Sequence, residues 1–272
     1  MHIYGVDFTS APNPRKPITV VSATLDQRAL VVENCQALRD FAAFEAFLRL
    51  TPPWLAACDF PFGLPHVLLT NLDWPIEWSA YMRLVASLSK RAFEQTLTNY
   101  RLTRPVGDKH HLRVTDKLAG ACSPMMLYRV PVAKMFFQGA TRLLESGVSV
   151  PPLLQGADAR VVLEGYPALV ARTFIGRQSY KSDDRARQTP ERLLARQRLL
   201  DALCSPALVT EYSITLDLPH DLRQRLSSDP TGDFLDALLC AVQAAWAFRQ
   251  PGYGIPAGCD RAEGWIVDPH IL

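Results

Sequence analysis

Three short apolar segments that each end on an acid constrain the fold of this chain more than any other feature. They span residues 3–7, 54–59 and 160–164, and end at Asp7, Asp59 and Glu164. Runs of this length and composition are typical of buried strands. If the three strands are parallel neighbours, their acids meet at one edge of one sheet, which is where open α/β sheets hold their ligands.

The segments between the first two of these strands predict an antiparallel start to the sheet. Residues 18–24 and 29–32 are strand candidates joined at hairpin length, and residues 37–49 carry apolar side chains at helical spacing. This helix returns the chain so that strand four runs parallel to strand one. We therefore expect an α/β fold with a mixed sheet flanked by helices, in which strands one to three are antiparallel and strands one, four and five are parallel.

A helical insertion is expected between strands four and five. Residues 77–102 have the apolar periodicity of one long helix, and residues 125–145 form a second helical region. We interpret about residues 77–150 as an insertion within a single domain of residues 1–272, although this length suits either one large α/β domain or two small ones. After strand five, we expect helices over residues 168–174, 189–203 and about 233–248, and an edge segment at residues 264–267.

Positive charge is concentrated in this insertion. Residues 82–134 contain ten Lys and Arg against three Asp and Glu, a net charge of +7, whereas the whole chain has a net charge of +2. The asymmetry favours a basic lobe that faces a nucleic acid or a phosphate, with an ordinary solvated helical surface as the alternative. The candidate contacts to a substrate phosphate are Arg113 and Lys117 in the insertion and Lys181 after strand five.

Several classes of protein do not fit the sequence. Charged residues interrupt any apolar stretch near the N-terminus, so no signal peptide is expected. The longest uncharged apolar run, residues 237–248, is too short to span a membrane. The six cysteines lie far apart and show neither CxxC nor Cys–His metal-binding spacing. We expect reduced cysteines in a cytoplasmic protein.

A divalent cation is the expected partner of the acids. The apolar segment of residues 233–248 adds Asp233 and Asp236 to the three strand-end acids. Like charges repel and burial makes each ionised carboxylate more costly, so a cation is needed to neutralise such a cluster. Oxygen ligands favour Mg²⁺ or Mn²⁺. Capping of a loop or a helix start is the alternative role for each acid, and we expect one of Asp233 and Asp236 to cap while the other faces the site.

Four motifs, in chain order, carry a family resemblance: GVDFTS at residues 5–10, CDFPFGLP at 58–65, LEGYPA at 163–168 and GDFLDALLCA at 232–241. Together they resemble the DUF429 family of predicted nucleases, which has a ribonuclease H-like fold. The strand order and the positions of the acids are similar to those of the wider ribonuclease H-like superfamily. The resemblance implies catalytic and metal-ligating roles for Asp7, Asp59, Glu164 and Asp236, with Asp233 as a further metal ligand.

The leading functional hypothesis is a metal-dependent phosphodiester hydrolase, a nuclease. In this hypothesis Asp7 bridges two metal ions, Asp59, Glu164 and Asp236 complete the ligand set, and a nucleic acid lies along the basic insertion. One alternative is an actin-like or sugar-kinase-like phosphotransferase that uses Mg-ATP. That enzyme needs a glycine-rich phosphate turn after strand four, where the sequence has a single glycine. The other alternative is a non-catalytic nucleic-acid-binding module.

Overall fold

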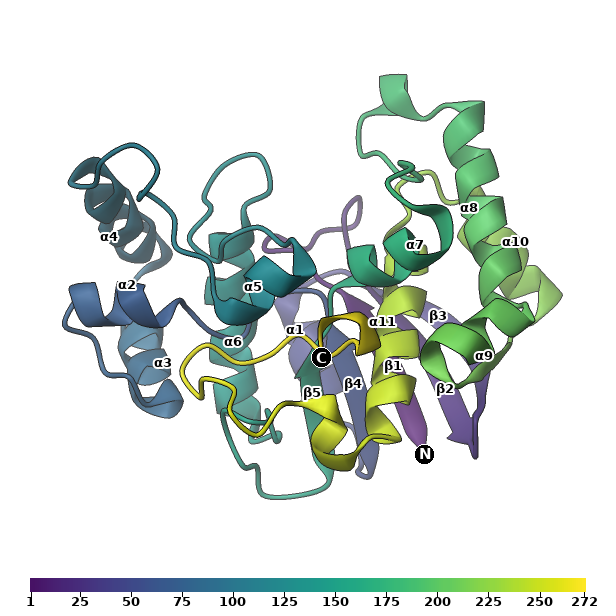
Figure 1. Ribbon diagram of the computed structural model, residues 1–272, viewed down its shortest axis with the longest axis horizontal. Helices are drawn as coiled ribbons and strands as arrows, with labels where there is room; N and C mark the ends of the chain where they lie inside the picture. Colours follow the sequence, from purple (N-terminus) through teal and green to yellow (C-terminus); the bar gives the residue numbers. More distant parts are fainter.

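One six-stranded mixed sheet forms the centre of the molecule (Figure 1). The structure is a computed structural model and describes residues 1–272. Its strands are β1 His2–Asp7, β2 Ile18–Asp26, β3 Ala29–Leu38, β4 Trp54–Cys58, β5 Arg160–Glu164 and β6 Thr215–Asp217. Their spatial order is β5-β4-β1-β2-β3-β6. The pairs β1–β2 and β2–β3 are antiparallel, and β1–β4, β4–β5 and β3–β6 are parallel. The predicted directions of the first five strands are confirmed, and β6 is a strand that the sequence did not predict.

Helices cover both faces of the sheet, which gives the molecule three layers (Figure 1). One face carries α7 Pro167–Ile175, α8 Pro190–Leu203, α9 Pro206–Tyr212, α10 His220–Ser228 and α11 Asp233–Phe248. The other face carries α1 Phe41–Leu48, α2 His66–Asn71, α3 Trp78–Ser87, α4 Lys90–Leu102 and α6 Val132–Ser146. Side chains alternate along each strand, so Ile3 of β1 packs into the first core and Val6 into the second.

Helix α11 is the buried element that fixes the geometry of the candidate site. It packs across β1, β2 and β4, and nearly all of its residues are buried. Gly5 in β1 allows this close packing, because a Cβ at this position would collide with backbone atoms of Ala237 and Ala241. Any larger residue at position 5 would push α11, and the acids in its first turn, away from the end of β1.

The helix expected over residues 37–49 is shorter in the structure. Strand β3 continues to Leu38, and α1 begins at Phe41. The carboxylate of Asp40 accepts a hydrogen bond from the Ala43 amide (2.8 Å) and caps the helix. The apolar periodicity therefore predicted α1 correctly, but the predicted helix began too early and included the last residues of β3.

The long helix expected over residues 77–102 is two helices, and this prediction was wrong. Helix α3 ends at Ser87 and α4 begins at Lys90. The break falls at Ser89, whose hydroxyl accepts a hydrogen bond from the Ala92 amide (3.1 Å) and caps α4. The two helices pack in the same core, so their apolar periodicity continues across the break.

The second helical region, expected over residues 125–145, is helical only from Val132 to Ser146. Pro131 occupies the N-cap, where its missing N–H costs nothing. A short helix that was not predicted, α5 Val114–Ala119, lies between α4 and α6. Helices α2 to α6 all lie between β4 and β5 in the sequence, and α3 to α6 fall within residues 77–150.

The C-terminal segment completes the sheet edge beside β5. Ile266 forms a parallel bridge with Glu164, and the Val267 amide donates a hydrogen bond to the Glu164 carbonyl (2.9 Å). This is the edge segment that was expected at residues 264–267. All six cysteines are free. None of the helices combines the length and the apolar character that crossing a bilayer requires.

Candidate metal centre

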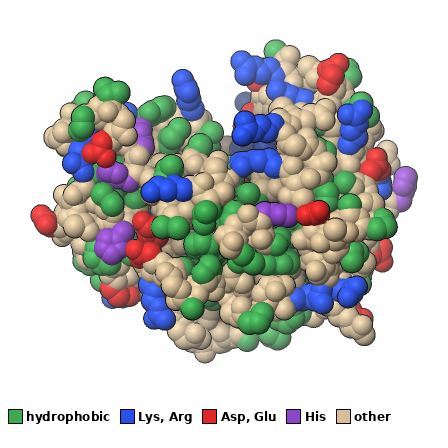
Figure 2. Space-filling model, viewed as in Figure 1, with side chains coloured by type: hydrophobic (Ala, Val, Ile, Leu, Met, Phe, Trp, Pro, Cys, Tyr) green, Lys and Arg blue, Asp and Glu red, His purple; other side chains and the backbone are tan.

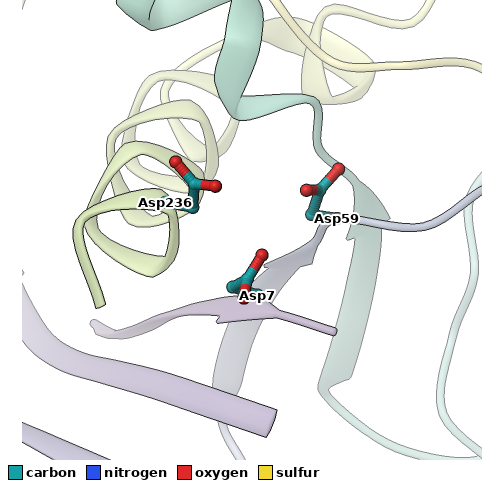
Figure 3. A group of neighbouring side chains, drawn as sticks. All are labelled: Asp7, Asp59 and Asp236. Atoms are coloured by element: carbon teal, nitrogen blue, oxygen red, sulfur yellow. The ribbon is translucent and has the colours of Figure 1, made fainter. Parts of the chain in front are cut away.

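Three aspartates from three different elements meet at the carboxyl end of the parallel strands (Figure 3). Asp7 ends β1, Asp59 follows β4 directly, and Asp236 lies in the first turn of α11. Strands β1 and β4 pair with Val6 beside Cys58, so the next residues, Asp7 and Asp59, lie level with each other. One carboxylate oxygen of each aspartate lies within 4.8 Å of the others. We call Asp7, Asp59 and Asp236 the aspartate triad.

Neither Asp7 nor Asp59 has a hydrogen-bond or ion-pair partner within the protein, and Asp7 is the more buried of the two. It is 9% exposed, and its carboxylate accepts no hydrogen bond and forms no ion pair within the protein. Burial raises the pKa of Asp7 well above its ordinary value, the positive charge of Lys181 partly offsets this, and the nearby Asp233 and Asp59 raise the pKa further. A buried carboxylate in this state requires either a proton or a cation.

The other two members of the triad have different surroundings. Asp59 is partly exposed, and burial of its carboxyl group raises its pKa to about 6, with Lys181 acting in the opposite direction. Asp236 is fully buried and has two partners. The Tyr180 hydroxyl donates to its Oδ1 atom, and the Lys181 ammonium contacts its Oδ2 atom. Asp236 is therefore held in place, whereas Asp7 is not.

Asp233, the other candidate on α11, lies outside the triad. It is the first residue of the helix, and Gly232 is the N-cap, so neither aspartate is the cap that we expected. Its Oδ1 atom lies 3.6 Å from the Nζ atom of Lys16, which also contacts Asp183 at 2.5 Å. The structure thus pairs Asp233 with a lysine and directs Asp236 toward the other two aspartates.

Glu164 ends β5 as predicted, but it does not join the triad. Strands β4 and β5 pair with Cys58 beside Glu164, so Glu164 lies one residue short of the level of Asp59. Because side chains alternate along a strand, this offset turns Glu164 toward the core that contains Cys58 and Val162, away from α11. The expectation that all three strand-end acids form one cluster is corrected on this point.

Arg113 binds the carboxylate of Glu164 from the side of the insertion. Its Nη2 atom donates to Glu164 Oε1 (2.5 Å) and Asp116 Oδ1 (2.7 Å), and its Nε atom donates to Asp116 Oδ2 (3.0 Å). Its Nη1 atom donates to Glu164 Oε2 (2.8 Å) and to the Glu263 carbonyl (2.9 Å). We call Arg113, Asp116 and Glu164 the Arg113 cluster.

The Arg113 cluster is saturated with hydrogen bonds. A guanidinium has five N–H donors, and all five are used here. Glu164 Oε2 also accepts a hydrogen bond from the Phe62 amide (2.9 Å). Arg113 is 1% exposed, so it has neither a free donor nor access to solvent. This corrects the prediction that Arg113 contacts a substrate phosphate: its role is to join α5 to β5.

A cavity of about 300 Å³ adjoins the triad. Asp59, Asp236 and Lys181 line the end next to the triad. The Arg113 cluster also lines the cavity, and the remaining lining is mostly apolar and includes Cys122, Val130, Val132, Met135, Tyr166 and Pro167. Small-molecule sites span about 300–1,000 Å³, so this cavity accommodates one small group at a time. Lys117 does not line it, and lies exposed on α5 without an ion-pair partner.

Sequence reasoning missed Tyr180 and Lys16, the two side chains that engage acids of α11 alongside Lys181. Tyr180 is 8% exposed within a loop that is otherwise polar, and a single aromatic residue in such a loop was the only available signal. Lys16 reaches Asp233 from the turn that follows β1. Lys16 and Asp233 are distant in the sequence, so no local pattern indicates their contact.

The fold and this centre define a mixed α/β protein with a buried group of carboxylates that is able to hold a metal ion. The chain belongs to the family described as a protein of unknown function (DUF429), whose model matches residues 5–258, a range that includes the whole triad. No curated protein and no solved structure matches the chain. The family resemblance of the four motifs is therefore confirmed, and nuclease activity stays a prediction.

Proposed function

We propose that the protein is a metal-dependent phosphodiester hydrolase whose substrate is a nucleic acid. The observation that supports this proposal most is the unpaired, buried Asp7 carboxylate within 4.8 Å of two other aspartates. Keeping such a group without a partner is costly for the fold, since a buried ionised acid is destabilising until a cation joins it. The arrangement therefore favours a functional role over a structural one.

The residues of the triad fit Mg²⁺ or Mn²⁺. Both ions prefer carboxylate oxygens, and the triad offers one from each of Asp7, Asp59 and Asp236. Mg²⁺ is usually bound by one or two carboxylates together with water and substrate phosphate oxygens. The adjoining cavity begins at Asp59 and Asp236, so a phosphate in the cavity would lie next to the ion.

The proposed reaction is hydrolysis of one P–O bond. The oxygen of a water molecule bonds to phosphorus, the bond from phosphorus to the leaving oxygen breaks, and the proton from water is transferred to the leaving oxygen. When bound, a divalent cation would neutralise charge on the phosphate and lower the pKa of a water molecule. The chain's own residues hold the cation through the triad and orient the phosphate in the cavity, where Lys181 supplies a positive charge.

The distribution of charge favours a nucleic acid over a small phosphate ester. Figure 2 shows Lys and Arg side chains on both sides of the hollow that separates the insertion from α7 and α8. Some cations of the insertion are paired with acids, among them Arg104 and Arg113. Others, including Arg91, Lys117 and Arg129, are exposed and form no ion pair. Several exposed cations on one insertion suit the phosphates of a nucleic-acid strand.

A phosphotransferase that uses Mg-ATP has less support. It needs a turn after β4 whose backbone N–H groups are free to hold phosphates. In this protein two amides of that turn already have partners: Phe62 donates to Glu164 (2.9 Å) and Leu64 donates to the Tyr81 hydroxyl (3.3 Å). A phosphate would have to displace these buried hydrogen bonds.

The test is hydrolysis of labelled oligonucleotides by metal-free protein to which Mg²⁺ or Mn²⁺ is added back. Single-stranded and duplex DNA and RNA are assayed together with ATP. We expect metal-dependent cleavage of at least one nucleic acid, and none by the Asp7→Asn or Asp59→Asn variants. Asp26→Asn, a change at an exposed aspartate of β2, is the matched control and should remain active. ATP turnover without cleavage would instead support the phosphotransferase, and inertness with both ions would support a binding module.

A further inference from the structure

Lys181 is held more firmly than its partial exposure suggests. Its two neighbours in the chain are fixed by backbone hydrogen bonds: the Tyr180 carbonyl accepts from Arg196 Nη1 (2.8 Å), and the Ser182 amide donates to the Pro230 carbonyl (3.1 Å). The Lys181 stem packs against Gly232, where a Cβ would lie 2.7 Å from the Lys181 Cβ atom. Gly232 also has φ +71°, a conformation that favours glycine.

The fixed stem of Lys181 places its ammonium group next to the triad. Lys181 Nζ contacts Asp236 Oδ2, and the side chain is 40% exposed. Its charge also acts on Asp7 and Asp59, where it opposes the larger effect of burial on the pKa of each acid. Lys181 is therefore a cation placed beside all three carboxylates, and it lines the cavity that we assign to the phosphate.

The charges around the triad balance with one divalent ion. Three ionised carboxylates and one ammonium leave a net charge of −2. The two further acids that a second ion would require already have cations of their own. Glu164 is bound by Arg113, and Asp233 lies beside Lys16. A second divalent ion would therefore have to displace a lysine or break the saturated Arg113 cluster.

We propose that the triad binds a single divalent cation and that the Lys181 ammonium takes the place of a second one, where it contacts a non-bridging oxygen of the substrate phosphate. This inference deepens the proposed function and rests on it for the identity of the substrate. It replaces the expectation of two metal ions. In this arrangement Lys181 is a substrate-contacting residue that also limits how strongly the triad attracts metal.

The test is a calorimetric titration of Mn²⁺ into metal-free protein, without substrate. Wild type is expected to bind one Mn²⁺ per chain. Lys181→Met removes a positive charge next to the triad and should bind Mn²⁺ about tenfold more tightly or better, a difference of about 1.4 kcal/mol. Lys117→Met, a change at an exposed lysine on α5, should bind as wild type does. Lys181→Gln is a second neutral variant in case the methionine perturbs folding, which thermal melting would reveal.

A second measurement separates the contact with phosphate from the contact with metal. An oligonucleotide whose bridging 3′-oxygens are replaced by methylene groups, which cannot be cleaved there and keeps both non-bridging oxygens, is titrated at saturating Mn²⁺. Lys181→Met should bind it more weakly than wild type although it binds Mn²⁺ more tightly, and Lys181→Arg should recover most of the oligonucleotide affinity. A purely structural lysine would move both affinities in the same direction.

The outcomes distinguish this inference from the proposed function. Two Mn²⁺ per wild-type chain, or a Lys181→Met variant whose Mn²⁺ affinity is not raised, would overturn the inference even if the protein cleaves nucleic acid. One Mn²⁺ per chain and tighter binding by Lys181→Met would support the metal part of the inference even if no nucleic acid is cleaved. A wild type that binds no Mn²⁺ would overturn both proposals.

Discussion

The aspartate triad and the Arg113 cluster lie at the same edge of the sheet, and both contain buried carboxylates at the ends of parallel strands. Every donor of Arg113 is matched to an acceptor, and each oxygen of Glu164 has at least one partner. In the triad, neither Asp7 nor Asp59 has a partner, and Lys181 is the one cation in contact with an Asp236 oxygen. One residue of strand register separates the two environments.

The function of a group of buried acids depends on the cations around them. Burial and negative charge are common to both sites, so neither property alone indicates function. What distinguishes the sites is whether the protein itself supplies the compensating cation. The Arg113 cluster is complete and connects the insertion to the sheet. The triad lacks enough positive charge to balance its carboxylates, and a bound cation would supply it.

The largest effect is expected from breaking the complete cluster. Arg113→Met leaves Asp116 and Glu164 buried without their cation, and removal of one partner of a buried ion pair typically costs about 3–5 kcal/mol. Urea unfolding measures the loss. Arg91→Met, at an exposed arginine without a partner, should change stability by no more than about 0.5 kcal/mol. Similar stability of the two variants would show that the Arg113 cluster is not the structural site described.

The opposite result is expected at the triad. Asp7→Asn removes an uncompensated charge, so the metal-free variant should be as stable as wild type or more stable. Wild type should gain about 2.7 kcal/mol from an ion at 100 times its dissociation constant, and the variant should lose this gain. Thermal melts with and without Mn²⁺ measure both effects, with Asp26→Asn as the control that keeps the gain. A destabilised Asp7→Asn protein that still responds to Mn²⁺ would contradict this account.

The free energy of unfolding should depend on pH through the titration of Asp59. Burial raises the pKa of Asp59 to about 6, compared with about 3.9 in an unfolded chain. A raised pKa means that the folded state binds the proton more tightly than the unfolded state does. The stabilisation that protonated Asp59 contributes to the folded state is therefore complete below about pH 3.9 and is lost as the pH rises through about 6.

Urea unfolding in EDTA across this range provides the measurement. Asp59→Asn, which cannot ionise, should lose less stability than wild type between pH 4.5 and 7.5. Added Mn²⁺ should oppose the loss in wild type, because it binds the ionised form. Parallel pH profiles for wild type and Asp59→Asn would argue against a perturbed carboxyl group at this position.

The smallest effect is expected at the exposed cations of the insertion. Each phosphate contact contributes about 0.7–0.9 to the slope of log affinity against log salt concentration. Lys117→Ala should reduce the slope for oligonucleotide binding by about that amount and leave Mn²⁺ binding unchanged. The salt titration uses the Asp7→Asn protein, so that no substrate is consumed, and Mn²⁺ binding by Lys117→Ala is measured with the triad intact. An unchanged slope would remove Lys117 from the nucleic-acid interface.

Much of the fold was predictable because its signals are local. The directions of five strands were predicted correctly from three signals. These were the strands that end on an acid, the hairpin that follows β1 and the apolar periodicity of the helices. The long helix over residues 77–102 was wrong because both halves pack in the same core, so the periodicity continued through the Ser89 cap. The three-residue strand β6 was too short to show an alternating pattern.

The candidate site was predictable to the extent that it depends on strand ends. Asp7 and Asp59 were both identified, and the structure brings them together with Asp236. The placement of Glu164 depends on a register offset of one residue, which the sequence does not reveal. The saturation of Arg113 depends on contacts with residues up to 150 positions away. Such long-range pairing determines which acids are neutralised, and it becomes visible only in three dimensions.

The most direct test of the central claim is a crystal structure of the protein soaked with Mn²⁺ and recorded at a wavelength where manganese scatters anomalously. We expect one anomalous peak in contact with carboxylate oxygens of Asp7, Asp59 and Asp236, and none at Glu164, whose contacts with Arg113 should be unchanged. A peak bound to Glu164, or no peak at the triad at millimolar Mn²⁺, would contradict the claim that the aspartate triad forms a metal site.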